Sequence, residues 1–189
     1  LPPIEKVVGP EAEAKESRKA LSLLFEVSES IDRCLIPLLQ KIESPCHTYE
    51  DLILVCQQIV EEEFDLEDRV SFLGSHPRIG EVKGLSKISA NEQQNHKPTD
   101  PKNCFDVALQ RLNRVYEASY PGLRYVTFVN GRSREEIMHE MQHKLYGDGG
   151  LQDTLMIHER DDAWHIEVAR GIKDVFKIAV SRLGVLQRK

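Results

Sequence analysis

The sequence predicts an all-α fold, built as a non-bundle array of helices in a single compact domain over residues 1–189. Several stretches repeat apolar residues at the spacing of one helix face, and helix-starting patterns precede three of them. The one run with a strong strand preference, 125–129, has no partner run elsewhere in the chain. We therefore expect this run to be an extended connection between helices and not part of a sheet.

The first half of the chain is expected to hold an irregular lead-in over 1–16 and then helices as far as residue 73. An apolar stripe from Glu11 to about Gln40 should be divided into two helices at Pro37, because proline breaks or kinks a helix interior. Residues 48–64 should form a helix capped by Thr48 with Asp51 three positions later, and 67–73 a short one. The proposed stripe consists of Ala20, Leu23, Leu24, Val27 and Ile31.

The second half should hold helices that start at Ser89, at about Cys104, at Ser133 and at about Asp161. Ser89 with Glu92 and Ser133 with Glu136 both fit the capping-box pattern S-x-x-E. The last helix should run to about residue 183, and 130–131 should form a turn.

Composition and charge restrict the classes of partner. The chain has 189 residues, 40% hydrophobic and 30% charged, with a net charge of -6. An acidic surface attracts neither nucleic acid nor an anionic membrane, so we expect a small-molecule substrate and neither of those partners. No apolar run reaches the ~18 residues of a membrane span.

The four cysteines form no C-x-x-C pair, which favours free thiols and a cytoplasmic location. The terminal Gln187-Arg188-Lys189 does not match the peroxisomal S-K-L address, which a trimmed end could hide.

One segment matches the zinc-protease pattern H-E-x-x-H, namely His139, Glu140 and His143. On a helix, the two histidines point away from the apolar side that holds Ile137 and Met141. A catalytic zinc needs ligands that face a shielded cleft and a third protein ligand. We therefore expect no metal here, and a zinc hydrolase is the alternative function.

A second candidate is His76, which precedes Pro77 in the segment 76–80. Pro77 restricts His76 to extended backbone, and a histidine held in this way suits general acid–base chemistry, because histidine titrates near neutral pH. From composition alone, a turn histidine before proline is the simpler interpretation.

Two further charged residues have both structural and functional interpretations. Glu92 and Ser89 are explained by capping, but the same helix start offers free N–H groups to an anion. Arg182 lies on the flank of the apolar stripe of the last helix, where it needs an anionic partner. The alternative for Arg182 is a side chain that extends its charge to water beside the chain end.

Five motifs occur in order along the chain, and together they resemble the OHCU decarboxylases, which act on 2-oxo-4-hydroxy-4-carboxy-5-ureidoimidazoline. The resemblance covers about residues 17–183. The motifs are His76-Pro77-Arg78-Ile79-Gly80, Ser89-Ala90-Asn91-Glu92-Gln93, Leu112-Asn113-x-x-Tyr116, Tyr125-Val126-Thr127-Phe128-Val129-Asn130-Gly131-Arg132 and Lys177-Ile178-Ala179-x-x-Arg182-Leu183.

The resemblance implies an all-helical, usually homodimeric enzyme that needs no metal or organic cofactor. It implies a catalytic His76, an acid/base Glu92 and a substrate-binding Arg182. It also implies pocket residues, which are Pro77, Ser89, Gln93 and the backbone of Tyr125, Val126 and Thr127. The chain departs from the family pattern in polar stretches at 94–102 and 146–161. An inert helical binding module with the same fold is the other alternative.

Overall fold

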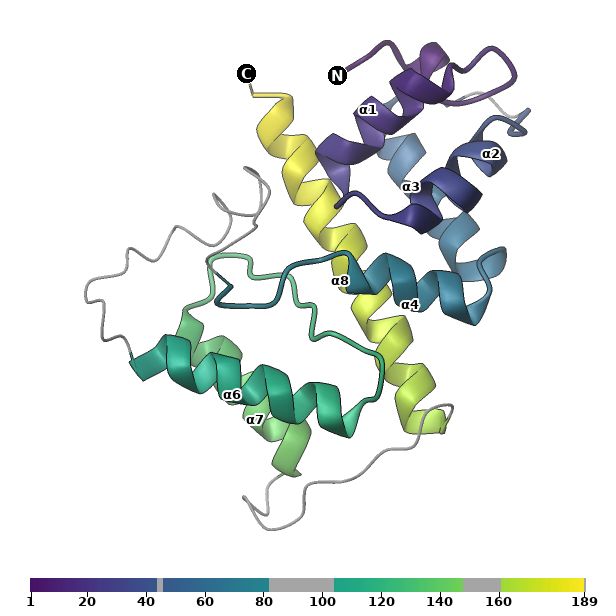
Figure 1. Ribbon diagram of the computed structural model, residues 1–189. Coiled ribbons are helices and arrows are strands. Elements are labelled where there is room, and N and C mark those ends of the chain that lie inside the picture. Colours follow the sequence, from purple (N-terminus) through teal and green to yellow (C-terminus); the bar gives the residue numbers. More distant parts are fainter. Residues whose placement is uncertain (44–45, 82–103, 148–160, 189) are drawn as a thin grey trace. The chain divides into compact units, whose positions relative to one another are not determined.

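The computed structural model describes residues 1–43, 46–81, 104–147 and 161–188 (Figure 1). These residues form helices and no strand, which confirms the all-α prediction for the part of the chain described. No helix among them is long and apolar enough to cross a membrane. The elements are η1 (Ile4–Lys6), α1 (Ala14–Leu24), η2 (Ile31–Leu35), α2 (Ile36–Leu39), α3 (Tyr49–Glu62), α4 (Leu66–Gly74), α6 (Cys104–Ser119), α7 (Arg134–Tyr146) and α8 (Asp162–Leu186).

The chain divides into two compact units. Unit 1 comprises Leu1–Ser75 and Ile172–Lys189, and unit 2 comprises His76–Gly171, so α8 contributes to both. The expectation of one domain over 1–189 stays a prediction.

The core of unit 1 is a cluster of phenylalanine rings. Phe25, Phe72 and Phe176 are each 3% exposed or less, and Phe64 joins them at the edge of Phe72. The ring centres of Phe25 lie 5.6 Å from Phe72 and 5.4 Å from Phe176, within the range of favourable aromatic pairs. Because these rings come from α4, α8 and the segment after α1, one cluster joins parts of the chain that are far apart in sequence.

The first two helices are separated at a different place from the one predicted. The chain leaves α1 at Phe25, whose backbone is extended, and Val27 is 69% exposed, so the expected stripe and the expected break at Pro37 are wrong. Pro37 lies inside a continuous helical stretch, directly after the π turn η2, where the Ile36 N–H bonds to the Ile31 carbonyl. Pro37 is the second residue of α2, and proline is tolerated in the first turn of an α-helix, where its missing N–H costs least.

Two predicted helix caps are present, and each forms a capping box. At α3, the Asp51 N–H donates to Thr48 Oγ1 at 3.1 Å and the Thr48 N–H donates to Asp51 Oδ2 at 3.0 Å. At α7, Ser133 and Glu136 exchange the same pair of bonds, at 3.1 and 2.6 Å. The capping box predicted at Ser89 lies outside the described residues.

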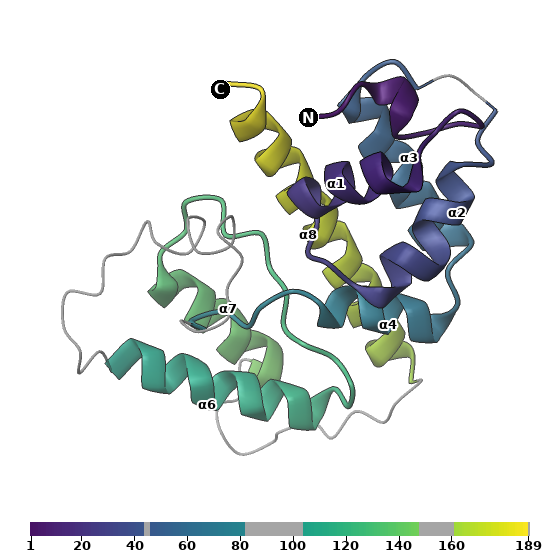
Figure 2. The same cartoon turned by 45° about the horizontal axis from the view of Figure 1, so that its top comes forward.

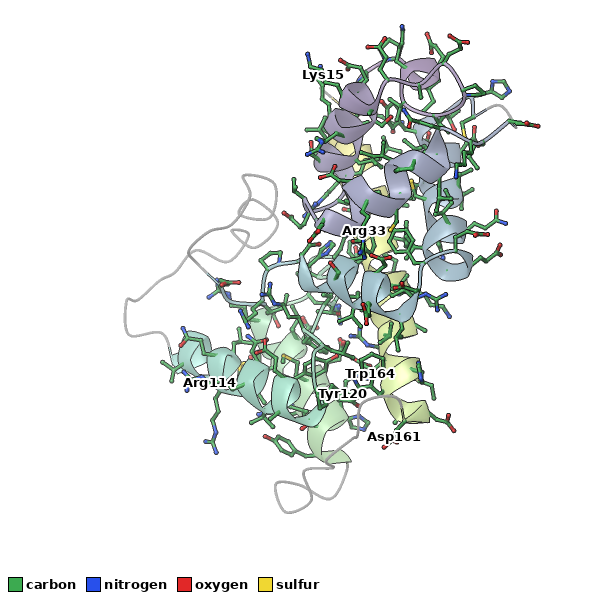
Figure 3. All side chains as sticks on the ribbon, turned by 45° about the vertical axis from the view of Figure 1, so that its right-hand side comes forward. Lys15, Arg33, Arg114, Tyr120, Asp161 and Trp164 are labelled. Atoms are coloured by element: carbon green, nitrogen blue, oxygen red, sulfur yellow. The ribbon has the colours of Figure 1, made fainter. Side chains whose placement is uncertain are left out.

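Unit 2 is built around α6 and α7, which lie side by side in both views (Figures 1 and 2). Residues 123–129 connect them without forming a strand, as predicted, and the chain turns at Asn130 and Gly131, both at positive φ. At the α8 end of the unit, Trp164 is 1% exposed and its Nε1 donates to the Pro121 carbonyl at 2.9 Å. Figure 3 shows Trp164 close to Tyr120, the residue that precedes Pro121.

Candidate functional site

His76 opens unit 2 and is buried, with 3% of its surface exposed. Its carbonyl accepts a hydrogen bond from Arg124 Nη1 at 3.3 Å. Pro77, which follows it, is half-buried and fixes the backbone direction at this point. The histidine before Pro77 is therefore enclosed by protein.

The loop that carries His76 is attached to α6 at successive residues. Arg78 forms two bonds to the Glu117 carboxylate, at 2.5 and 3.1 Å. Asn113 is buried, and its Nδ2 donates to the Ile79 carbonyl at 2.9 Å. These contacts give a physical reason for the Asn113 of the motif in α6, because this residue holds the histidine loop in place.

Gly80 is the last residue of the segment 76–80, and two constraints there require glycine. Its φ is +80°, and an added Cβ would lie 3.2 Å from Leu109 Cδ1 of α6. The positive φ disfavours any L side chain, and the close approach lets the loop pack directly on the helix.

The segment 125–127 is buried beside α7. Tyr125, Val126 and Thr127 are each 4% exposed or less. The Tyr125 hydroxyl donates to Glu140 Oε1, and the Thr127 hydroxyl donates to the same oxygen at 3.3 Å. Arg132 completes this group by an ion pair with Glu140. Burial, together with the Glu140 carboxylate, raises the pKa of Tyr125 above its ordinary value.

On the α8 side, the same segment contacts a buried network centred on Glu167, which is 2% exposed. Its carboxylate accepts from the Tyr116 hydroxyl, from Lys144 Nζ and from Arg170, each at 2.7 Å. Burial alone would raise the pKa of Glu167, but Arg170 and Lys144 outweigh it and the pKa is lowered. Arg170 Nη2 also donates to the Val126 carbonyl at 2.9 Å, so the network is connected to the segment 125–127.

Arg182 is in unit 1, and its side chain is 3% exposed. Its Nη2 lies 2.8 Å from Glu26 Oε1, and its Nη1 donates to the Leu24 carbonyl at 3.4 Å. The prediction that this arginine needs an anionic partner is confirmed. The alternative, a charge extended to water, is wrong because the guanidinium is enclosed.

The zinc-like pattern on α7 has the geometry expected from its helical projection. His139 and His143 are both exposed, whereas Ile137, Met141 and Leu145 are buried. Glu140, which would be the general base of a zinc protease, instead bonds Tyr125, Thr127 and Arg132. Among the described residues, no group of three or more His, Cys, Asp or Glu is placed to hold a metal ion.

A comparison with protein families decides the assignment. The model of the family described as OHCU decarboxylase matches residues 10–184. The chain belongs to the OHCU decarboxylase family. No curated protein matches the sequence.

Solved structures share the fold of this family member. A crystal structure of OHCU decarboxylase in the presence of (S)-allantoin aligns over 94% of this chain and 100% of its own, with a TM-score of 0.59 and 13% identity. A crystal structure of (S)-allantoin synthase aligns over 92% of this chain and 50% of its own, with a TM-score of 0.53 and 18% identity. At these identities the likeness concerns the fold alone.

The family match spans every candidate residue, including those that the structure does not describe. Ser89, Glu92 and Gln93 lie outside the described residues, as do most of the two polar stretches that depart from the family pattern. Their roles stay predictions.

Sequence reasoning missed Glu167 and Arg170, and it considered Glu140 only as part of the zinc-protease pattern. A usable signal existed for Glu167, which lies three residues after the buried Trp164 and four before the buried Gly171. A glutamate on the apolar stripe of a helix needs a cationic partner, just as Arg182 on such a stripe needs an anionic one.

Proposed function

We propose that this chain catalyses the decarboxylation of 2-oxo-4-hydroxy-4-carboxy-5-ureidoimidazoline to (S)-allantoin in uric acid degradation. The observation that carries the proposal is the family match over residues 10–184. The enclosed His76 on a loop attached to α6 supports it. We further propose a cytoplasmic homodimer that acts on this small molecule without a metal or organic cofactor.

The substrate itself supplies the electron sink. Its carboxylate is on a carbon next to the ring imine, which is conjugated with a ring carbonyl. When the bond to the carboxylate breaks and CO₂ leaves, the electron pair is delocalised over these groups, so no pyridoxal- or thiamine-type group is required. The protein has to orient the carboxylate, stabilise the developing negative charge and deliver a proton to one face.

We assign the orientation of the carboxylate to Arg182, because a guanidinium matches a carboxylate in shape and charge. We assign charge stabilisation to backbone N–H groups near Ser89 and in the segment 125–127. His76, paired with Glu92, would carry out the proton transfers. Two orders of steps fit these roles: His76 removes the hydroxyl proton before CO₂ leaves, or it only protonates the carbanion afterwards. Pro77 and Gln93 would complete the wall of the pocket.

The test is turnover of freshly generated substrate by the purified full chain. We expect a rate well above the spontaneous decay, a single enantiomer of allantoin and no change in rate on addition of EDTA. A chain that leaves the decay rate unchanged would be an inert binding module. A rate abolished by EDTA and restored by zinc would instead indicate a metal-dependent enzyme.

The oligomeric state needs a separate measurement. Light scattering coupled to size-exclusion chromatography should give about twice the mass of the 21.6 kDa chain. A monomer mass at working concentration would contradict the homodimer alone and would leave the proposed chemistry standing.

A further inference from the structure

The segment 125–127 is held by side chains from two helices of unit 2. The side chains of Tyr125 and Thr127 both bond Glu140 of α7, as alternate residues on one side of an extended backbone can do. The carbonyl between them, that of Val126, accepts from Arg170 Nη2 of α8 at 2.9 Å. Side chains and main chain are therefore fixed by different partners.

A bond to the Val126 carbonyl has a consequence for the next residue. The peptide group is planar and trans, so its C=O and the following N–H point in opposite directions. Because the Val126 carbonyl points to Arg170, the Thr127 N–H points away from Arg170. The guanidinium thus sets the direction of a main-chain donor that it does not itself contact.

Arg170 is held firmly enough to set this direction. Its guanidinium forms hydrogen bonds of 2.7 to 2.9 Å with the buried Glu167 carboxylate, and it lies 5.1 Å from the centre of the Tyr125 ring. Burial alone would lower the pKa of Arg170, but the Glu167 carboxylate raises it, so the side chain keeps its charge. A planar fork with several donors can bond a carboxylate and a carbonyl at once, which a single ammonium group does less well.

We propose that Arg170 is a positioning residue, which acts through the Val126 carbonyl to aim the Thr127 N–H at the negative charge that develops as CO₂ leaves. The proposal rests on the proposed function, in which the backbone of 125–127 stabilises this charge. A donor aimed in advance accelerates the reaction because it needs no reorientation in the transition state.

Lys144 provides a matched control. It donates to the same Glu167 carboxylate at 2.7 Å, and its side chain is 24% exposed against 25% for Arg170. Replacing either Arg170 or Lys144 by glutamine removes one cation from Glu167 and leaves the other. Of the two, Arg170 is the one with a bond to the Val126 carbonyl.

The experiment compares Arg170→Gln, Arg170→Lys and Lys144→Gln with the wild-type chain, by steady-state kinetics and thermal melting. We expect kcat to fall about ten- to hundredfold in both Arg170 variants, with KM changed less than about threefold, because misplaced catalytic groups mainly affect the transition state. Lys144→Gln should lower the melting temperature about as much as Arg170→Gln and keep kcat. If Arg170→Gln does not fold, Arg170→Lys, which keeps the charge beside Glu167, decides.

Three results would overturn the proposal. Wild-type kcat in the Arg170 variants would show that the bond to Val126 does not matter for the reaction. An equal loss of kcat in Lys144→Gln would show that Arg170 acts only by stabilising Glu167. Absence of turnover in the wild-type chain is the separate failure of the proposed function, and the inference would fall with it.

Discussion

Each of the two units is stabilised internally by a different kind of contact. Unit 1 has at its centre the rings of Phe25, Phe72 and Phe176, each almost completely buried. Unit 2 has at its centre the carboxylate of Glu167, bonded to Tyr116, Lys144 and Arg170. Apolar packing depends on volume and area and little on direction, whereas a hydrogen-bonded network fixes the direction of each atom.

The two kinds of contact differ in how much stability they contribute and in how precisely they fix atomic positions. A buried phenylalanine contributes roughly 1.5–3 kcal/mol through burial alone. A buried ion pair gives little or no net stability compared with apolar residues of the same volume, since both charges lose their water. We therefore interpret the phenylalanine cluster as the main source of stability in unit 1. The Glu167 network then serves to hold the segment 125–127 in one conformation.

The largest expected effect is on the chemistry of unit 2. His76→Asn keeps a polar side chain before Pro77 but removes the imidazole, which can both accept and donate a proton. We expect folded protein with a catalysed rate about 10²–10⁴-fold lower, as for a lost general acid–base. Chiral chromatography, run beside the rate assay, should show the product approaching the racemic mixture of the uncatalysed reaction. One enantiomer made at near-normal speed would mean that another residue delivers the proton.

The next effect tests the apolar core of unit 1. Phe72→Ala removes a ring that contacts three others, and we expect a loss of about 3–5 kcal/mol in the free energy of unfolding. Urea denaturation followed by circular dichroism measures it. Leu54→Ala, at a side chain that is 65% exposed, is the matched control and should change stability by no more than about 0.5 kcal/mol. Similar losses in both variants would contradict the role given to the ring cluster.

A smaller effect should depend on pH. The pKa of Glu167 is lowered in the folded chain, so its contribution to stability is complete above the ordinary value of 4.5 and is lost as the pH falls through the folded pKa. Lys144→Gln should therefore lower the urea midpoint at pH 7, and the difference from wild type should shrink below about pH 4.5. Fluorescence of Trp164 follows unit 2 in this titration, because the chain has one tryptophan.

The control for the pH effect is Lys177→Gln, which lies in unit 1 and is therefore followed by circular dichroism. Lys177 pairs with Asp174 at 2.8 Å, but its side chain is 60% exposed, so the pair should contribute little at any pH. A difference between Lys144→Gln and wild type that does not shrink as the pH falls from 4.5 to the onset of acid unfolding would show that Glu167 is not the titrating group.

The smallest effect is expected on the exposed side of α7. The double substitution of His139 and His143 by alanine should leave the rate and the melting temperature nearly unchanged, because both side chains are exposed. Kinetics with and without added zinc would check this. A double variant that is folded but inactive would favour the zinc hydrolase instead.

Local signals in the sequence were sufficient for most of the helices. The caps at Thr48 and Ser133 predicted the starts of α3 and α7, because a capping box involves only four consecutive residues. The break after α1 was misplaced because Val27 and Ile31 continue the apolar period numerically although the chain has left the helix. Periodicity alone does not register such a break.

The candidate site was predictable to the extent that its residues form linear motifs. His76 and Arg182 both belong to such motifs, and the structure buries both side chains. The residues that hold the segment 125–127 come from α7 and α8, and their pairing depends on contacts over more than ten positions in sequence. Glutamate and arginine in helices are usually exposed. The sequence therefore does not predict that Glu167 accepts a hydrogen bond from Tyr116, and only the tertiary structure shows it.

The π turn at Ile31–Leu35 affects how this chain should be aligned with its relatives. A π turn contains one residue more than an α turn, so the stretch Ile31–Leu39 is equivalent to a regular helix that carries a single-residue insertion. At 13–18% identity, an alignment based on letters alone has little to guide it here. A one-residue gap placed within η2 keeps Leu35 and Leu39 in register with buried positions of a relative that has a regular helix. The same gap moved into α1 would shift Leu21 and Leu24 off the core positions that they occupy.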